Sequence, residues 1–106
     1  MKSVNREKRI MRGAVVYLTT DRHPSVVVSN EAQNKYSEYL IVVPMSSRQK
    51  RLDLKTHAIV NYHDSIIMAE NIKTVRKVDV RSIAHILNKE SMERVDACLS
   101  AALNLK

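Results

Sequence analysis

Three short runs of β-branched and other apolar residues in the first half of the chain limit its possible folds most strongly. They cover residues 15–18, 26–29 and 40–43, and valine or isoleucine occupies most of their positions. β-Branched residues favour strands, and an apolar run without alternating polar residues is typical of a strand buried on both faces. We therefore expect a compact sheet at the centre of the protein.

The second half of the chain adds weaker strand patterns and one clear helix. The strand patterns occur at residues 56–60, 65–68 and 82–87, and residues 70–75 indicate a short strand or turn. Asn88 can cap a helix, and one apolar stripe of that helix contains Met92, Val95, Leu99, Ala102 and Leu103. A further short helix is expected to begin at Ser29 or Asn30 and to reach residue 34. These elements predict a mainly β fold with α-helices, in which a small antiparallel barrel packs against a C-terminal helix.

The length and charge of the chain narrow the class of protein. Its 106 residues suit a single domain, residues 1–106, of which residues 1–11 form a basic N-terminal extension. The 18 Lys and Arg residues outnumber the 11 Asp and Glu residues, and the excess lies mainly before residue 52, where ten basic residues accompany four acidic ones. A basic surface attracts phosphate-rich partners. Nucleic acid is therefore the first candidate partner, and an acidic protein is the second. Alternatively, the basic residues only keep the surface solvated and bind no partner.

Several classes of site are excluded by what the chain lacks. Gly13 is its only glycine, and glycine-rich phosphate loops and dinucleotide fingerprints need several. Cys98 is its only cysteine, and we expect its thiol to be buried and inert. His57, His63 and His85 are not at metal-ligand spacing, so we interpret them as surface or packing residues and expect no metal site and no cofactor. No stretch approaches the ~20 apolar residues of a membrane span. We expect a cytoplasmic protein without a membrane partner.

Two strands are flanked by side chains that suit phosphate chemistry. Arg22 and His23 come just before the strand at residues 26–29, and Ser46 comes just after the strand at residues 40–43. The cations Arg48, Lys50 and Arg51 follow at once. Rigid strands that end in basic and hydroxyl residues indicate a site at the rim of the sheet.

An ordered set of motifs extends this pattern over residues 11–105. It comprises Arg-Gly at 12–13, His-Pro-Ser-Val-Val-Val-Ser-Asn at 23–30, Val-Val-Pro-Met-Ser-Ser at 42–47, Glu-Asn-Ile-Lys-Thr-Val at 70–75 and Glu-Ser-Met-Glu-Arg-Val-Asp at 90–96. In order and spacing, the set resembles the MazF/PemK/Kid family, although no single motif is specific by itself. The resemblance implies an SH3-like barrel, a homodimer, and a toxin held inactive by a cognate acidic antitoxin. It also implies metal-independent cleavage of single-stranded mRNA at a short sequence, through 2′-hydroxyl attack that leaves a cyclic phosphate and a 5′-hydroxyl end.

The resemblance also assigns roles to individual residues. The family's Arg-Pro step falls on His23 and Pro24, so Arg22, one residue earlier, is predicted to stabilise the phosphate charge while His23 acts as acid or base. Ser46 stands where the family has a functional threonine, and Glu70 stands where some members have a base. Arg48, Lys50 and Arg51 are predicted to bind RNA phosphates. The alternative to these catalytic roles is purely structural. Arg22 and His23 would then be ordinary turn residues, and Glu70 would form an ion pair with a nearby Lys or Arg.

Two departures from the family keep other functions open. The loop between the first two strands, residues 19–23, is shorter than in the family, and Ala14 replaces the acidic residue that follows Arg-Gly. In the family, this loop helps to hold the RNA and to gate the site, so the resemblance implies that a shorter loop alters the substrate preference and the activity. The alternatives are a toxin that acts on DNA gyrase, as the CcdB relatives do, and a noncatalytic nucleic-acid-binding module of the same fold.

Overall fold

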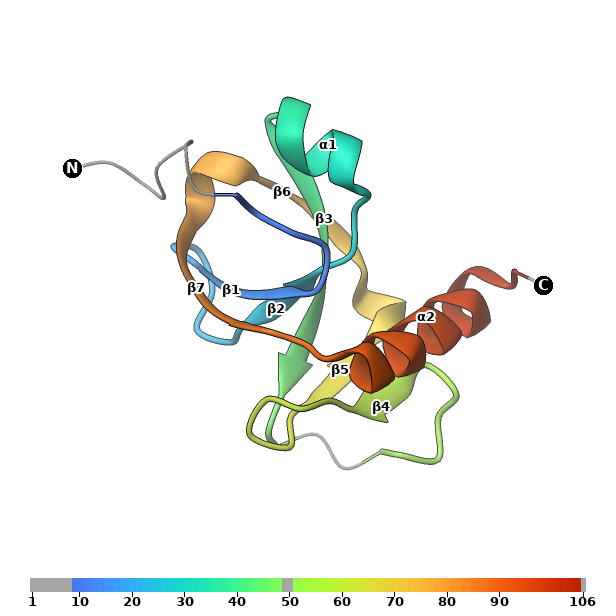
Figure 1. The fold of residues 1–106 in the computed structure, drawn as a ribbon. Helices are drawn as coiled ribbons and strands as arrows, with labels where there is room; N and C mark the ends of the chain where they lie inside the picture. Colours follow the sequence, from blue (N-terminus) through green and yellow to red (C-terminus); the bar gives the residue numbers. More distant parts are fainter. Residues whose placement is uncertain (1–8, 49–50, 106) are drawn as a thin grey trace.

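The computed structural model describes residues 9–48 and 51–105, and it is built around one seven-stranded antiparallel sheet (Figure 1). Its strands are β1 (Ala14–Leu18), β2 (Ser25–Val27), β3 (Tyr39–Ser46), β4 (His57–Ile59), β5 (Ile66–Met68), β6 (Lys73–Arg76) and β7 (Val80–Ile86). Helix α1 (Glu31–Tyr36) joins β2 to β3, and α2 (Lys89–Leu103) follows β7. Two short 3-10 turns, η1 (Ala69–Asn71) and η2 (Lys77–Asp79), flank β6. The predicted mainly β fold with a C-terminal helix is confirmed.

Strand β3 is the centre of the sheet. The strand order is β4-β5-β3-β2-β1-β7, and β6 pairs with the first half of β3 while β5 pairs with its end. Turn η2 then leads the chain back to β1, where the Thr19 amide donates to the Asp79 carbonyl at 2.8 Å. The sheet therefore curls into a small barrel, and α2 lies outside it against β4 and η1 (Figure 1).

The apolar runs are buried on both faces of the sheet, as predicted. Val15, Val26 and Val43 belong to one cluster, which Val95 and Cys98 of α2 help to cover. Their sequence neighbours Val16, Val27 and Val42 belong to a second cluster on the other face, together with Leu18 and Leu40. Because neighbouring residues of a strand point to opposite faces, an unbroken valine run can fill both clusters.

Both predicted helices form, with small differences in extent. The Asn88 side chain accepts from the Ser91 amide at 2.8 Å and caps α2, and Asn30 caps α1 in the same way through Gln33. Helix α1 runs to Tyr36, two residues beyond the predicted end. In α2, Leu103 continues the predicted apolar stripe by its spacing, but it is 51 % exposed, whereas Ala102 packs on the core.

The other boundaries differ slightly from those predicted. Strand β2 ends at Val27 and not at Ser29, because the amides of Val28 and Ser29 both donate to the Ile41 carbonyl and the chain turns toward α1. The three weaker strands are confirmed as β4, β5 and β7. Residues 70–75 contain the end of η1 and most of β6. The basic extension falls mostly outside the described residues, and its Ile10 is buried in the core.

The Arg-Gly motif at residues 12–13 is structural. The Arg12 guanidinium donates to the Val28 carbonyl at 2.8 Å and pairs with Asp96 of α2 at 2.7 Å. Gly13 has a φ of +96°, a left-handed conformation that side chains other than glycine rarely adopt. The pair therefore fastens the start of β1 to α2 and to the segment that follows β2.

Ser25→Ala is expected to raise the free energy of unfolding by about 1 kcal/mol, because it removes a buried hydroxyl that has no hydrogen bond. Within residues 9–48 and 51–105, Ser25 Oγ is the one buried side-chain oxygen or nitrogen without a partner. Urea unfolding measures the change. The matched control is Ser91→Ala, which removes an equally buried oxygen that accepts from the Asn61 amide at 2.8 Å. That control should destabilise the protein, and equal losses in both variants would contradict the expectation.

Candidate active site

The structure brings three of the four predicted catalytic residues to one end of the barrel. Arg22 and His23 lie exposed in the loop before β2, and Ser46 lies half-buried at the end of β3. Ser25 pairs with Pro44, and the Met45 amide donates to the Pro24 carbonyl at 3.1 Å. His23 and Ser46 are the residues next to this last backbone contact between the two segments. The loop residues 22–23 are irregular and not part of a strand, so the alternation rule that would separate their side chains does not apply.

Asp21 holds this loop in place. Its carboxylate accepts from the His23 amide at 3.2 Å and from the Lys73 ammonium at 3.3 Å. Burial raises the pKa of Asp21, but the hydrogen bonds from the His23 backbone and from Lys73 outweigh burial, so the pKa is lowered overall. Lys73, from the Ile-Lys-Thr motif of β6, thereby has a role in positioning the loop that carries Arg22.

Asp21→Asn is expected to reduce the acid sensitivity of the fold. A carboxyl with a lowered folded-state pKa contributes stability above its unfolded value, here 3.8, and this contribution is lost as the pH falls through the folded value. Unfolding free energies measured by urea titration from about pH 6 to pH 2 should therefore fall less steeply in the variant. Asp64→Asn, at an exposed loop position, is the control. Parallel pH profiles for wild type and Asp21→Asn would contradict the expectation.

A second arginine lies beside Arg22, and the sequence interpretation missed it. Arg81 of β7 and Arg22 both line a shallow open depression of about 480 Å³, together with Leu18, Thr19, Thr20 and Asp21. The register between β1 and β7 shifts between Tyr17, opposite Ser82, and Leu18, opposite Val80. Arg81 is thus the extra residue of a β-bulge, a device that redirects side chains. No local motif could reveal it, because the bulge arises from pairing between distant strands.

The Ser46 hydroxyl is held by one hydrogen bond from the backbone. Its Oγ accepts from the Arg48 amide at 3.1 Å, which fixes the position of the oxygen and leaves the hydroxyl proton available. Arg48, two residues later, is exposed. The end of β3 therefore presents a hydroxyl and a cation next to the Arg22 loop.

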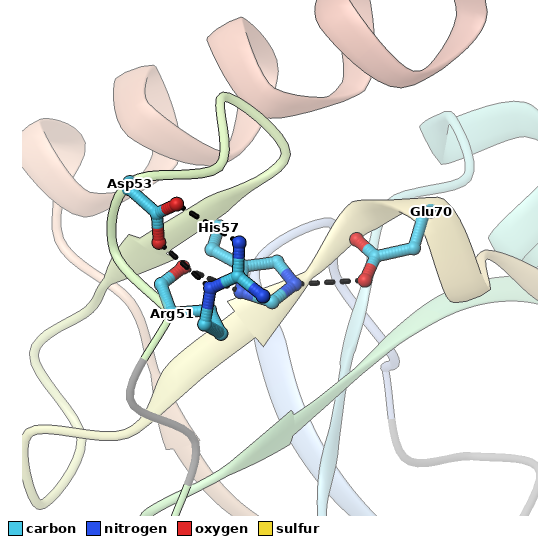
Figure 2. Close-up of polar contacts among 4 residues, drawn as sticks. All are labelled: Arg51, Asp53, His57 and Glu70. Carbon is cyan, nitrogen blue, oxygen red and sulfur yellow. Dashed lines mark hydrogen bonds and ion pairs between the residues drawn. The ribbon is translucent and has the colours of Figure 1, made fainter.

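The other predicted RNA-binding cations are placed differently. Lys50 lies outside the described residues. The Arg51 guanidinium binds both oxygens of Asp53 at 2.9 Å each, and this hydrogen bonding is the main reason that the pKa of Asp53 is lowered to about 2 (Figure 2). A phosphate at Arg51 would have to share the guanidinium with that carboxylate.

Glu70, the fourth predicted catalytic residue, pairs with a histidine and not with the Lys or Arg that the structural alternative predicted. Its Oε2 lies 2.7 Å from Nε2 of His57, a buried histidine of β4 (Figure 2). Burial raises the pKa of Glu70, but hydrogen bonds from His57 and Thr56 lower it overall. Its side chain is 42 % exposed, and its hydrogen-bond partners are not Arg22, His23 or Ser46.

His63 and His85 pack against the ring of Tyr62. The rings of Tyr62 and His85 are stacked with centroids 5.6 Å apart, and His63 meets Tyr62 edge-on at 4.5 Å. Within residues 9–48 and 51–105, no three His, Cys, Asp or Glu side chains are grouped as a metal site would require. Over the same residues, no helix has the length and apolar character needed to cross a bilayer.

Comparison with known proteins gives a family and several similar structures. The model of a family described as PemK-like, MazF-like toxin of type II toxin–antitoxin system matches residues 12–103. An endoribonuclease from Mycobacterial species has a TM-score of 0.83 at 21 % identity, with 92 % of this chain and 94 % of that chain covered. A Mycobacterial endoribonuclease in complex with its cognate antitoxin has a TM-score of 0.80 at 22 % identity, covering 91 % and 96 %. MazE-MazF from Deinococcus radiodurans has a TM-score of 0.79 at 19 % identity, covering 94 % and 100 %. At these identities the structures show a shared fold.

Proposed function

Because the chain belongs to the PemK-like, MazF-like toxin family of type II toxin–antitoxin systems, we propose that it is an endoribonuclease toxin that cuts single-stranded mRNA in the cytoplasm. The observation that supports the proposal is that the loop of Arg22 and His23 and the side chain of Ser46 adjoin the paired ends of β2 and β3, where the Met45 amide donates to the Pro24 carbonyl. The fold shared with two endoribonucleases supports it further. A basic, open site suits a flexible polyanion, since charge attracts RNA and the shallow surface accepts a single strand.

The proposed reaction is attack of the substrate's own 2′-hydroxyl on the adjacent phosphate. The 2′-oxygen loses its proton and bonds to phosphorus, the bond to the 5′-oxygen breaks, and that oxygen takes up a proton. The products are a cyclic phosphate and a 5′-hydroxyl end, and no metal or cofactor takes part. Arg22 stabilises the negative charge that develops on the phosphate oxygens, and Ser46 donates a hydrogen bond to one of them.

Of the two candidate bases, His23 is favoured over Glu70. A general base works best when its conjugate acid titrates near the working pH, and histidine is the side chain that does so. The lowered pKa of Glu70 makes its carboxylate a weaker base. Glu70 as a base therefore stays a prediction, and His23 is the favoured candidate.

The proposed assembly is a homodimer that a cognate acidic antitoxin inactivates. One similar structure is an endoribonuclease in complex with its cognate antitoxin, and another is a MazE-MazF complex. The formal net charge of +7 suits an acidic partner that competes with RNA for the same basic surface.

Cleavage of a long natural mRNA in excess chelator tests the proposed function. Discrete cuts should appear that survive the chelator, and the new 5′ ends should carry hydroxyl groups. A folded, dimeric protein that cuts none of a broad set of mRNAs would contradict the proposal. Inhibition of DNA gyrase would then support the CcdB-like alternative, and RNA binding without cutting would support the noncatalytic module.

A further inference from the structure

His57, the first residue of β4, is a buried histidine that the proposed cleavage chemistry does not use. Its side chain is 2 % exposed. Nδ1 lies 2.8 Å from the backbone oxygen of Arg51, and Nε2 lies 2.7 Å from Oε2 of Glu70 (Figure 2). Both ring nitrogens therefore face oxygen atoms.

These two contacts determine how many protons the ring carries. A backbone carbonyl only accepts hydrogen bonds, so Nδ1 must donate to Arg51. An ionised carboxylate also only accepts, so Nε2 must donate to Glu70. Glu70 is ionised near neutral pH because the hydrogen bonds from His57 and Thr56 outweigh the effect of burial and lower its pKa. The two contacts together call for a ring that donates on both sides.

The charged groups around His57 suit a buried cation. Glu70 reaches it from η1, and Asp53 lies in the loop before β4, where the charge of His57 adds to the effect of Arg51 in lowering the pKa of Asp53. The guanidinium of Arg51 is itself paired with Asp53. From α2, the Cys98 thiol contributes no charge, since burial and then the nearby Glu70 raise its pKa.

The two bonds of His57 join two separate parts of the chain. The Arg51 carbonyl belongs to the loop between β3 and β4, which also carries Arg48. Glu70 belongs to η1, which packs against both β3 and α2. A second bond runs alongside, because the Ala69 amide donates to the Thr56 carbonyl at 2.9 Å. The buried ring therefore fastens the loop between β3 and β4 to η1, which packs on β3 and α2.

We propose that His57 is a positioning residue for RNA binding. As an imidazolium, it clamps the backbone of Arg51 to Glu70 and so holds the loop between β3 and β4 where Arg48 and Arg51 reach the phosphates of single-stranded RNA. This role rests on the proposed ribonuclease function. Glutamine cannot replace it, because both of its N–H donors lie on one nitrogen whereas His57 donates from two, and because the carboxylate of Glu70 would lose its partner charge.

The protonation state of the ring is the first test, and it needs no RNA. In the ¹⁵N-labelled wild-type protein at neutral pH, NMR should show a proton on both nitrogens of His57. In Glu70→Gln, where the neutral amide replaces the carboxylate, one of the two protons should be lost. A neutral His57 ring in the folded wild-type protein would overturn the proposal.

The effect of His57→Gln on the loop and on cleavage is the second test, with His85→Gln as the control. His85 is half-buried and contacts Asn61 at 3.2 Å, away from the loop between β3 and β4. His57→Gln should speed amide hydrogen exchange in residues 51–56. It should raise KM for RNA about 10-fold with little change in kcat. The slope of log binding constant against log salt concentration should become shallower by about the amount that one phosphate contact contributes. The control should match wild type in every measurement.

The cleavage kinetics of His57→Gln and of the wild type distinguish failure of the positioning role from failure of the proposed ribonuclease function. A merely destabilised variant would lose kcat with its folded fraction and keep its KM. A folded His57→Gln variant with wild-type KM and wild-type exchange would overturn the positioning role while cleavage itself stands. If the wild type neither binds nor cuts RNA, the proposed function and the RNA role both fail, while exchange and NMR still decide whether His57 clamps the loop.

Discussion

Arg22→Ala is expected to lower kcat/KM for RNA cleavage by about 10²–10³, the usual loss when one group that stabilises developing charge is removed. The guanidinium is exposed at the rim of the depression, so its loss should leave the unfolding free energy within about 0.5 kcal/mol of wild type. Initial rates of cleavage of a short labelled RNA, together with a urea titration, measure both quantities. The control is Arg76→Ala, because Arg76 pairs with Tyr39 at the opposite end of β3 from Ser46.

Two further variants decide which side chain has taken the place of the family's arginine. Arg22→Lys keeps the charge but loses the planar fork that binds two phosphate oxygens, so partial activity is expected. His23→Ala should lower kcat and flatten the pH profile of the rate if His23 transfers the proton. Full activity in Arg22→Ala with none in His23→Ala would show that the histidine alone serves the phosphate, and would contradict the assignment of Arg22.

The sheet could be predicted because local signals agree with the final packing. The valine runs at residues 15–18 and 26–29 are buried on both faces, and Asn88 caps α2 through its side chain as expected. The details that the sequence does not reveal depend on contacts between distant residues. Leu103 has the right spacing for the stripe, but nothing in the helix itself shows that the core ends at Ala102.

The candidate site was only partly predictable, for the same reason. Arg22, His23 and Ser46 belong to short motifs at strand ends, so the chain order alone pointed to them. Arg81 enters through a bulge between β1 and β7, and Lys73 enters through an ion pair with a residue 52 positions away. His57 was interpreted as a surface or packing residue. It is indeed packed, but its charge partner Glu70 becomes visible only when β4 and η1 lie together.

Leu40→Ala is expected to lower the free energy of unfolding by about 3 kcal/mol, because it removes a large side chain from a fully packed core and leaves a cavity. Leu40 is 0 % exposed and lies on β3, opposite Val75 of β6. The strand around it pairs on both edges, so the backbone cannot easily move inward to close the cavity. For a domain of this size, about 3 kcal/mol is a large share of the total stability and should lower Tm by more than 10 °C.

The control for Leu40→Ala is Leu52→Ala, the same chemical change at a side chain that is 48 % exposed. Solvent can fill the space left at Leu52, so its loss should cost less than about 1 kcal/mol. Urea titration and thermal unfolding of both variants measure the difference. Similar losses at the two positions would show that the barrel relaxes around Leu40, and would contradict the rigid, doubly paired β3 on which the geometry of Ser46 depends.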